Sequence, residues 1–322
     1  MHIYRHLDQL PHPFTPSVAS IGNFDGVHRG HRWVIANLID RARSRGLRSV
    51  VITFDPHPAR AIRPESSPAL LTPLAHKLDL LASTGVDDVV VLPFNGELAR
   101  MSARQFAQEV LHDSLGVVEL HEGENFRLGR QAEADVNVLK TLGGEFGFTV
   151  FSYPPQSFHG SAVSSSRIRA LIAEGNVSTA RRLLQRPFSV CSTPASGRGY
   201  GTRYTVPTIN LAPYAELLPQ NGVYITKLKV GAGLHAEIFD AVTNVGVRPT
   251  FGADSFTIES HLLDFHPIDL NETTPLELCF LQRLRDERRF PTPVDLREQI
   301  GYDVAQARRY FSLLHRLNSS KP

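Results

Sequence analysis

Hydrophobic residues in the first half of the chain alternate between short continuous runs and helically spaced stripes. Runs typical of buried strands occupy residues 18–21, 50–54, 89–92 and 148–151. Between them, apolar residues spaced three and four apart predict helices at 34–42, 78–81 and 106–115. This alternation is typical of a doubly wound α/β domain with a parallel sheet. Such sheets bind ligands at the carboxyl ends of their strands, near the point where strand order reverses.

The second half of the chain has a different pattern. Two apolar stripes at 168–172 and 177–184 end at Arg186-Pro187, which predicts a domain boundary there: residues 1–186 and 187–322. Strand-like runs then follow one another without helices, at 223–230, 236–242, 257–263 and 276–281. This order predicts a small antiparallel β-barrel.

A final helix is predicted after Thr292, a suitable N-cap that is followed by Pro293 and Asp295. The residues expected to face the barrel form one helical stripe: Leu296, Ile300, Val304, Ala307, Phe311 and Leu314.

Bulk composition sets limits on the class of protein. The 322 residues suffice for two domains, and 34 basic against 32 acidic side chains give a net charge of +2, too small to favour nucleic acid. No apolar run approaches the ~20 residues of a membrane helix, and the N-terminus lacks the apolar core of a signal peptide. The two cysteines, Cys191 and Cys279, lack metal-ligand spacing. We therefore expect a cytoplasmic protein with no nucleic-acid or membrane partner.

The most informative segment, residues 21–31, lies between the first predicted strand and the first helix. Gly22, Gly26 and Gly30 let the backbone turn sharply and approach a ligand closely. His28 and His31 flank the expected helix start, where free N–H groups and the helix dipole favour anions. Two imidazoles there can stabilise negative charge that develops on a phosphate. The alternative is an ordinary glycine-rich turn with two exposed histidines.

This His-x-Gly-His pattern resembles the first signature of the nucleotidylyltransferase superfamily. Residues 163–169 are similar to its second signature, Ser-Ser-Thr-x-Ile-Arg, with Ser166 in place of the threonine; an ordinary serine N-cap is the alternative there. The resemblance implies that His28 and His31 are catalytic. It also implies a set of ATP-binding residues: Gly22, Asn23, Phe24, Asp25, Gly30, Ser165, Ser166 and Arg169.

Between these signatures, residues 53–58 and several apolar runs resemble the flavin branch of the superfamily. The branch's Gly-x-Asp-Phe-x-Phe-Gly loop stands here at 123–129, with Asn125 replacing the acid and Leu128 replacing an aromatic residue. The strand before it, 118–122, is unusually polar. The resemblance implies flavin contacts from His57, Asn125 and Arg127, and the departures leave open an impaired adenylyltransferase.

The barrel half resembles riboflavin kinase. Residues 207–210 match the Pro-Thr-x-Asn motif, whose Thr208 hydroxyl and Asn210 carbonyl are hard oxygen ligands suited to Mg²⁺ shared with ATP phosphates. The preceding loop, with ATP-binding glycines Gly197, Gly199 and Gly201, offers backbone N–H groups for phosphates. Thr205 stands where the family usually has glycine.

Further kinase-like segments follow in family order at 219–224, 243–250, 258–265 and 284–290. Glu259 lies in the segment that resembles the strand of the catalytic glutamate, and a carboxylate can accept the proton of an alcohol that attacks a γ-phosphate. The resemblance implies flavin contacts from Arg248, Arg285 and Glu287.

Taken together, the resemblance covers residues 22–308 and is to the bacterial bifunctional riboflavin kinase/FMN adenylyltransferase (FAD synthetase) family. It implies an α/β nucleotidylyltransferase domain and a β-barrel kinase domain with a terminal helix. It also implies that ATP and Mg²⁺ serve to convert riboflavin to FMN and FMN to FAD. We expect small-molecule partners and at most weak self-association. The alternatives are a riboflavin kinase with an impaired adenylyltransferase domain and a non-catalytic flavin-binding regulatory protein.

Overall fold

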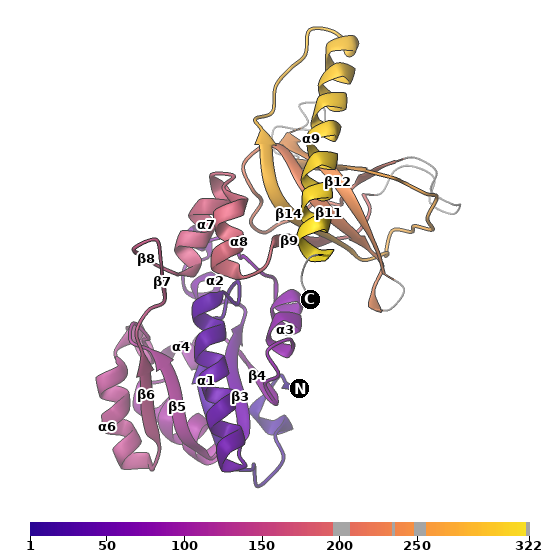
Figure 1. Cartoon of the computed structure of the whole chain (residues 1–322). Coiled ribbons are helices and arrows are strands. Elements are labelled where there is room, and N and C mark those ends of the chain that lie inside the picture. The colour runs from indigo at the N-terminus through magenta and orange to yellow at the C-terminus, as the bar shows by residue number, and fades with distance from the viewer. Residues whose placement is uncertain (196–206, 234–235, 248–255, 320–322) are drawn as a thin grey trace. The chain divides into compact units, whose positions relative to one another are not determined.

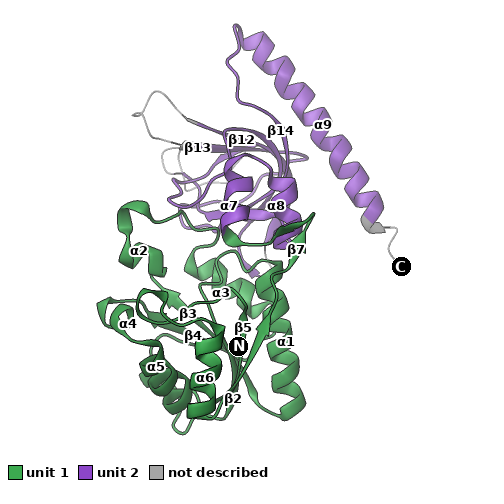
Figure 2. Cartoon of the chain, turned by 90° about the vertical axis from the view of Figure 1, so that its left-hand side faces the viewer, with its two compact units in different colours: residues 1–165 green, residues 166–322 purple. Residues whose placement is uncertain are grey.

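The computed structural model describes residues 1–195, 207–233, 236–247 and 256–319. The chain divides into two compact units, residues 1–165 and residues 166–322, which Figure 2 shows in two colours. None of the helices within the described ranges is both long enough and apolar enough to cross a membrane.

Unit 1 is built on a six-stranded sheet with the order β1-β4-β3-β2-β5-β6, in which all neighbouring strands are parallel. Figure 1 labels β3, β4, β5 and β6 of this sheet. Its strands are β1 His2–Tyr4, β2 Ser17–Ile21, β3 Arg48–Asp55, β4 Asp88–Pro93, β5 Val117–Gly123 and β6 Thr149–Tyr153. The chain proceeds from β2 outward to β4 and then crosses back to β5. Strand order therefore reverses between β2 and β5, which confirms the predicted doubly wound parallel sheet.

Helices cover both faces of this sheet. The helices of unit 1 are α1 Arg29–Arg45, α2 Pro58–Ile62, α3 Leu74–Ala82, α4 Gly96–Arg100, α5 Ala103–Gln105, the π-helix Phe106–Ser114 and α6 Val136–Phe146. Ile35 of α1 and Leu81 of α3 share one apolar cluster with Val51 of β3. On the other face, the π-helix and α6 pack on a second cluster that contains Leu120. Short 3₁₀ turns (Leu7–Gln9, Pro64–Ser66 and Arg130–Ala132) and the hairpin β7 Ser157–Phe158 with β8 Ser161–Ala162 complete the unit.

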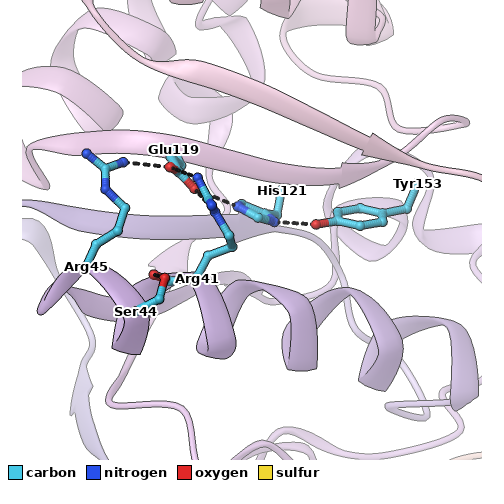
Figure 3. A network of polar contacts seen from close by, with 6 residues as sticks. All are labelled: Arg41, Ser44, Arg45, Glu119, His121 and Tyr153. Atoms are coloured by element: carbon cyan, nitrogen blue, oxygen red, sulfur yellow. Dashed lines mark hydrogen bonds and ion pairs between the residues drawn. The ribbon is translucent and has the colours of Figure 1, made fainter.

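A buried polar network attaches α1 to β5 and β6 (Figure 3). The Glu119 carboxylate accepts hydrogen bonds from Arg41 at 3.0 and 2.6 Å and from Arg45 at 2.6 Å. His121 lies between Glu119, at 3.3 Å, and the Tyr153 hydroxyl, at 2.7 Å. Hydrogen bonding from Arg41, with smaller contributions from His121 and Arg45, outweighs burial and lowers the pKa of Glu119 to about 2. The polar character of strand 118–122 is thus explained by packing beneath α1.

This network makes a testable contribution to stability. Because the pKa of Glu119 falls from 4.5 to about 2 on folding, its stabilisation is complete above pH 4.5 and is lost as pH falls toward 2. Glu119→Gln should lower the free energy of unfolding of unit 1 by roughly 1–2 kcal/mol at pH 7, less than the full 1.36 kcal/mol per pKa unit because Arg41 and Arg45 are half-exposed and solvent screens their charges. The difference from wild type should shrink toward pH 2, as measured by urea unfolding across this pH range.

The matched control is Glu145→Gln, which removes an ion pair between two exposed side chains, Glu145 and Arg104. Exposed pairs contribute at most ~1 kcal/mol, so this variant should change little. Equal destabilisation by the two substitutions would contradict the buried-network account.

Unit 2 holds an antiparallel sheet with the order β10-β13-β12-β11-β14-β9. Its strands are β9 Phe188–Ser192, β10 Thr208–Asn210, β11 Gly222–Val230, β12 Glu237–Val247, β13 Phe256–Leu262 and β14 Leu276–Arg285. β9 and β10 are the two outer strands of this sheet. The residues that follow β9 contact the end of β10 through a Pro194–Leu211 bridge and a hydrogen bond from Ala195 N to Asn210 O at 2.8 Å. These contacts join the two edges of the sheet at one end, so the structure agrees with the predicted barrel in the form of a half-barrel.

Two helices precede the barrel, α7 Ser165–Ala173 and α8 Val177–Leu184. α8 buries the side chains of Ala180 and Leu183 and packs against β9 and β14. Because of this packing, the compact units separate between Ser165 and Ser166, before the boundary predicted at Arg186.

The terminal helix α9, Pro293–Ser319, packs on the barrel through Ala307 and Phe311, which share an apolar cluster with Val223 and Val242. As predicted, Thr292 caps its start: the hydroxyl accepts a hydrogen bond from Asp295 N at 3.2 Å.

The predicted apolar stripe of α9 is wrong at its start. Leu296 and Ile300 are 43% and 44% exposed, because the helix makes its apolar contact with the barrel only from Val304 onward. The buried residue in the preceding turn is polar: Asp303 is bound to Arg285 of β14.

Candidate active sites

The turn from β2 to α1 has an unusual backbone. Positive φ angles occur at Phe24 (47°), Gly26 (80°) and Val27 (37°). Glycine adopts this conformation freely, whereas a β-branched residue such as valine does so only when its surroundings impose it. A conformation of this kind costs about 1–3 kcal/mol per residue and is common at functional sites. The turn lies at the carboxyl end of β2, beside the reversal of strand order.

Asp25 anchors the turn from its inner side. Its buried carboxylate accepts hydrogen bonds from Leu71 N at 3.1 Å and Thr72 N at 3.0 Å. The Thr72 hydroxyl in turn accepts one from Gly26 N at 3.0 Å. Ser165, from the second predicted signature, donates its hydroxyl to Asp25 O at 2.9 Å. The two segments that the sequence associated with phosphate binding therefore meet at this residue.

The two histidines of the turn lie against each other. His28 is the N-cap of α1, where its Nδ1 accepts a hydrogen bond from His31 N at 3.3 Å. The two rings stack with centroids 3.6 Å apart and planes 14° apart. A Cβ atom at Gly30 would lie 3.2 Å from the His28 ring, so glycine leaves room for the stack. The Phe24 ring meets His31 edge-on at 5.2 Å.

His31 is held in its neutral form. Burial lowers its pKa well below the ordinary value, and the charges of His28 and Lys77 lower it further. Its Nδ1 is buried without a hydrogen-bond partner among the residues that the structure describes. Buried polar atoms of native proteins are usually satisfied, so this nitrogen is suited to a ligand at the start of α1.

The structure brings a further residue, Lys77, to this site. Its ammonium is buried and donates hydrogen bonds to Asn23 O at 3.2 Å, Thr53 Oγ1 at 3.0 Å and Phe54 O at 3.4 Å. Lys77 is not among the site residues predicted from the sequence. The available signal was a lysine beside Leu78 on the apolar side of a predicted helix, a position where charge is rare.

At the reversal of strand order, a second carboxyl group supports β2. Glu122 of β5 accepts a hydrogen bond from Ile21 N at 2.6 Å and is 2% exposed. Burial raises the pKa of Glu122 well above its usual value. This contact fixes the last residue of β2. It therefore also fixes the start of the turn from β2 to α1, the histidine turn.

The remaining predicted residues of unit 1 lie at loops near the strand ends. His57 is the N-cap of α2 and accepts a hydrogen bond from Ala59 N at 3.2 Å. Asn125 and Arg127 are exposed on the loop after β5. Leu128, the departure from the family's aromatic residue, is buried in the core, so this replacement affects packing.

The last three predicted residues of the adenylyltransferase are Gly22, Ser166 and Arg169. Gly22 lies against the Phe24 ring, which would be 3.1 Å from a Cβ atom added at this glycine. Ser166 and Arg169 lie on α7, which belongs to unit 2 from residue 166 onward, with Ser166 exposed and Arg169 half-buried.

In unit 2, the predicted kinase residues share one face of the barrel sheet. Thr208 and Asn210 are half-buried on β10, while Ile209 between them is buried. Asn210 is in register with Glu259 of β13, and Glu259 with Asn244 of β12. Directly opposed residues have Cβ atoms about 4.5–5.5 Å apart. The register therefore produces a polar row of Asn210, Glu259 and Asn244 across three strands.

A second cross-strand pair lies beside this row. Thr208 is in register with His261, and its Oγ1 is 3.3 Å from His261 Nδ1. The Thr208 hydroxyl and the Asn210 side-chain carbonyl are on the same face, two residues apart on one strand. They provide the hard oxygen donors that Mg²⁺ prefers, next to the carboxylate of Glu259. This donor set fits the predicted metal site.

Arg285 and Glu287 follow the row at the end of β14. Val223 is in register with both Asn244 and Arg285, which extends the row to Arg285. The Arg285 guanidinium is bound to Asp303, with Nη2 2.8 Å from Oδ2. The Glu287 carboxylate covers Gly246, where an added Cβ would overlap it. The predicted residues Gly197, Gly199, Gly201 and Arg248 lie outside the described residues.

The two units correspond to two known families. The FAD synthetase family matches residues 11–167, and the riboflavin kinase family matches residues 184–311. A solved structure from Streptococcus pneumoniae, described as a macrolide-efflux protein, has a TM-score of 0.82 and 25% identity, and the match covers 95% of this chain and 98% of the other. Fold and sites thus define a two-unit protein of the FAD synthetase and riboflavin kinase classes.

Relatives of full length make the assignment more specific. The bifunctional riboflavin kinase/FMN adenylyltransferase of Pseudomonas fluorescens is 37% identical, over 96% of this chain and 97% of its own. The enzyme of the same name from Escherichia coli K12 is 34% identical, over 94% and 95%. The chain belongs to the bifunctional riboflavin kinase/FMN adenylyltransferase family.

The stacked imidazoles give a direct prediction. His31 should remain neutral down to a pH well below 6.5, and His28→Ala should raise its pKa because a neighbouring positive charge is removed. Ring nitrogen chemical shifts in ¹⁵N NMR across a pH series would measure both effects. His112→Ala, on the π-helix at the opposite face of the sheet, should leave the titration of His31 unchanged. An unaltered His31 titration in His28→Ala would contradict the coupling.

Proposed function

We propose that the chain is a bifunctional enzyme that phosphorylates riboflavin to FMN in unit 2 and adenylylates FMN to FAD in unit 1, with ATP and Mg²⁺ in both reactions. The observation that carries this proposal is the presence of two separate polar clusters, one in each family-matched region. One contains stacked histidines at a helix start. The other contains a carboxylate beside hard oxygen ligands on a barrel face.

In the kinase reaction, the primary hydroxyl of riboflavin attacks the γ-phosphorus of ATP, and ADP leaves. Glu259 is the proposed base that accepts the hydroxyl proton as the new O–P bond forms. Thr208 and Asn210 would hold Mg²⁺, which supplies positive charge to the ATP phosphates when bound. Asn244 and Asn210 flank Glu259 in register on the two neighbouring strands.

In the adenylyl-transfer reaction, a phosphate oxygen of FMN attacks the α-phosphorus of ATP, and pyrophosphate leaves. The FMN phosphate is already ionised at neutral pH, so no base is required. His28 and His31 at the start of α1 are proposed to stabilise the charge that develops on the α-phosphate, together with the free N–H groups of the helix. Ser165 would fix the turn through the Asp25 carbonyl.

The other predicted contacts complete the proposal. ATP is proposed to contact Gly22, Asn23, Phe24, Asp25, Gly30, Ser166 and Arg169 in the adenylyltransferase. Flavin is proposed to contact His57, Asn125 and Arg127 there, and Arg285 and Glu287 in the kinase. Neither Cys191 nor Cys279 is in a disulfide, which is consistent with a reducing cytoplasm as the site of action.

Product analysis tests the overall proposal. Purified protein with riboflavin, ATP and Mg²⁺ should produce FMN first and FAD later, separated by chromatography. FMN that accumulates without FAD would support the impaired-adenylyltransferase alternative, which Asn125 motivates. Absence of both products, with flavin still bound, would support the regulatory alternative.

Selective variants test the assignment of each cluster. Glu259→Gln should lower kcat for FMN formation by roughly 10²–10⁴, the usual contribution of a general base, and leave conversion of supplied FMN to FAD unchanged. His28→Asn should have the opposite selectivity. Assays of both half-reactions on each variant provide mutual controls for folding. Loss of both activities in either variant would contradict the assignment.

A further inference from the structure

A buried ammonium in unit 1 has no part in the chemistry proposed above. Lys77 of α3 is only 6% exposed. Its three described hydrogen-bond acceptors are neutral: the carbonyls of Asn23 and Phe54 and the hydroxyl of Thr53. Taking an ammonium out of water is costly, and the attraction of Asp25 and Asp55 offsets only part of that cost. A lysine kept in this position therefore suggests a use for its charge.

The acceptors of Lys77 all lie at the ligand edge of the sheet. Asn23 is the second residue after β2 and immediately precedes Phe24, whose φ is 47°. Thr53 and Phe54 form the carboxyl end of β3, the strand next to β2. One ammonium thus joins the ends of two neighbouring strands at the start of the histidine turn.

The same charge acts on the histidine pair. Lys77 is close enough to His31 for its positive charge to lower the pKa of that imidazole. Burial lowers the pKa of Lys77 itself to about 8, against the opposing attraction of Asp25 and Asp55. The groups that face this ammonium are therefore His31 of α1, Asp25 of the turn and Asp55 at the end of β3. His28 acts on the same imidazole from the N-cap of α1.

We propose that Lys77 is a positioning residue for adenylyl transfer, whose ammonium fixes the histidine turn through the Asn23 carbonyl and adds positive potential where the ATP phosphates bind. This inference rests on the proposed FAD-forming activity of unit 1. Its charge also adds to the larger effects of burial and of His28, which keep the pKa of His31 low. Loss of the ammonium proton above pH 8 should weaken both effects.

The central experiment compares Lys77→Met with Lys140→Met, an exposed lysine on α6 of the same unit. The value of kcat/KM for ATP in FAD formation would be measured from pH 5 to 10. Lys77→Met should lower it ~10-fold or more at pH 7, because a small misplacement of the groups that position a reaction can cost up to about 10²-fold. In the wild-type pH profile of kcat/KM, we expect a fall near pH 8 as Lys77 loses its proton. In Lys77→Met, this alkaline fall should disappear, and the fall on the acidic side should move to higher pH because the pKa of His31 rises. Lys140→Met should match wild type.

Two readouts separate this inference from general damage to the fold. Riboflavin kinase activity should stay unchanged in Lys77→Met, and NMR titration of His31 should show its raised pKa without any dependence on turnover. FAD formation with the wild-type pH profile in folded Lys77→Met would overturn the inference while leaving the proposed function intact. Wild-type protein that forms no FAD would overturn both.

A milder variant covers the case in which Lys77→Met does not fold. Thr53→Val removes one acceptor of the ammonium and keeps the shape of a buried strand residue. Because that acceptor stabilises the charged form, the alkaline fall should move to lower pH. An alkaline fall at the wild-type position in this variant would contradict the inference.

Discussion

The candidate site of unit 1 depends on buried polar groups that hold the turn from β2 to α1 in an unfavourable backbone conformation. Phe24 and Val27 adopt positive φ angles that their side chains oppose. The contacts of Asp25 with the 71–72 backbone, of Glu122 with Ile21 N and of Lys77 with Asn23 O hold the segment in place. The stacked imidazoles at the start of α1 are a product of these contacts.

In unit 2, the positions of the candidate site residues are determined by the register of the strands. Side chains alternate between the two faces of a strand, so a slip of one residue in β10 would turn Thr208 and Asn210 into the barrel interior and Ile209 outward. The burial of Ile209 and the closing contact between Ala195 N and Asn210 O oppose such a slip. The proposed base and metal ligands therefore owe their positions on the sheet to backbone pairing.

Much of this arrangement could be predicted from the sequence. Alternating apolar patterns identified the parallel and antiparallel sheets, and the spacing of His28 and His31 located a helix start because local backbone rules determine both. Contacts between distant segments could not be inferred in this way. Lys77 meets Asn23, Glu119 meets Arg41, and Asp303 meets Arg285 only after folding. For the same reason, periodicity alone overestimated the buried part of α9, because the apolar contact of this helix with the barrel begins only at Val304.

The exposed start of α9 has a consequence for the neighbouring flavin-binding candidates. Its first two turns bury little apolar surface, so their order depends on the Thr292 cap and on intrinsic helix propensity, both of which are weak. Local opening should therefore stop at Asp303, where Arg285 attaches the helix to β14. Arg285 thus lies at the border between a segment that we expect to open locally and a more stable one, so a ligand bound to Arg285 should change how far the helix opens.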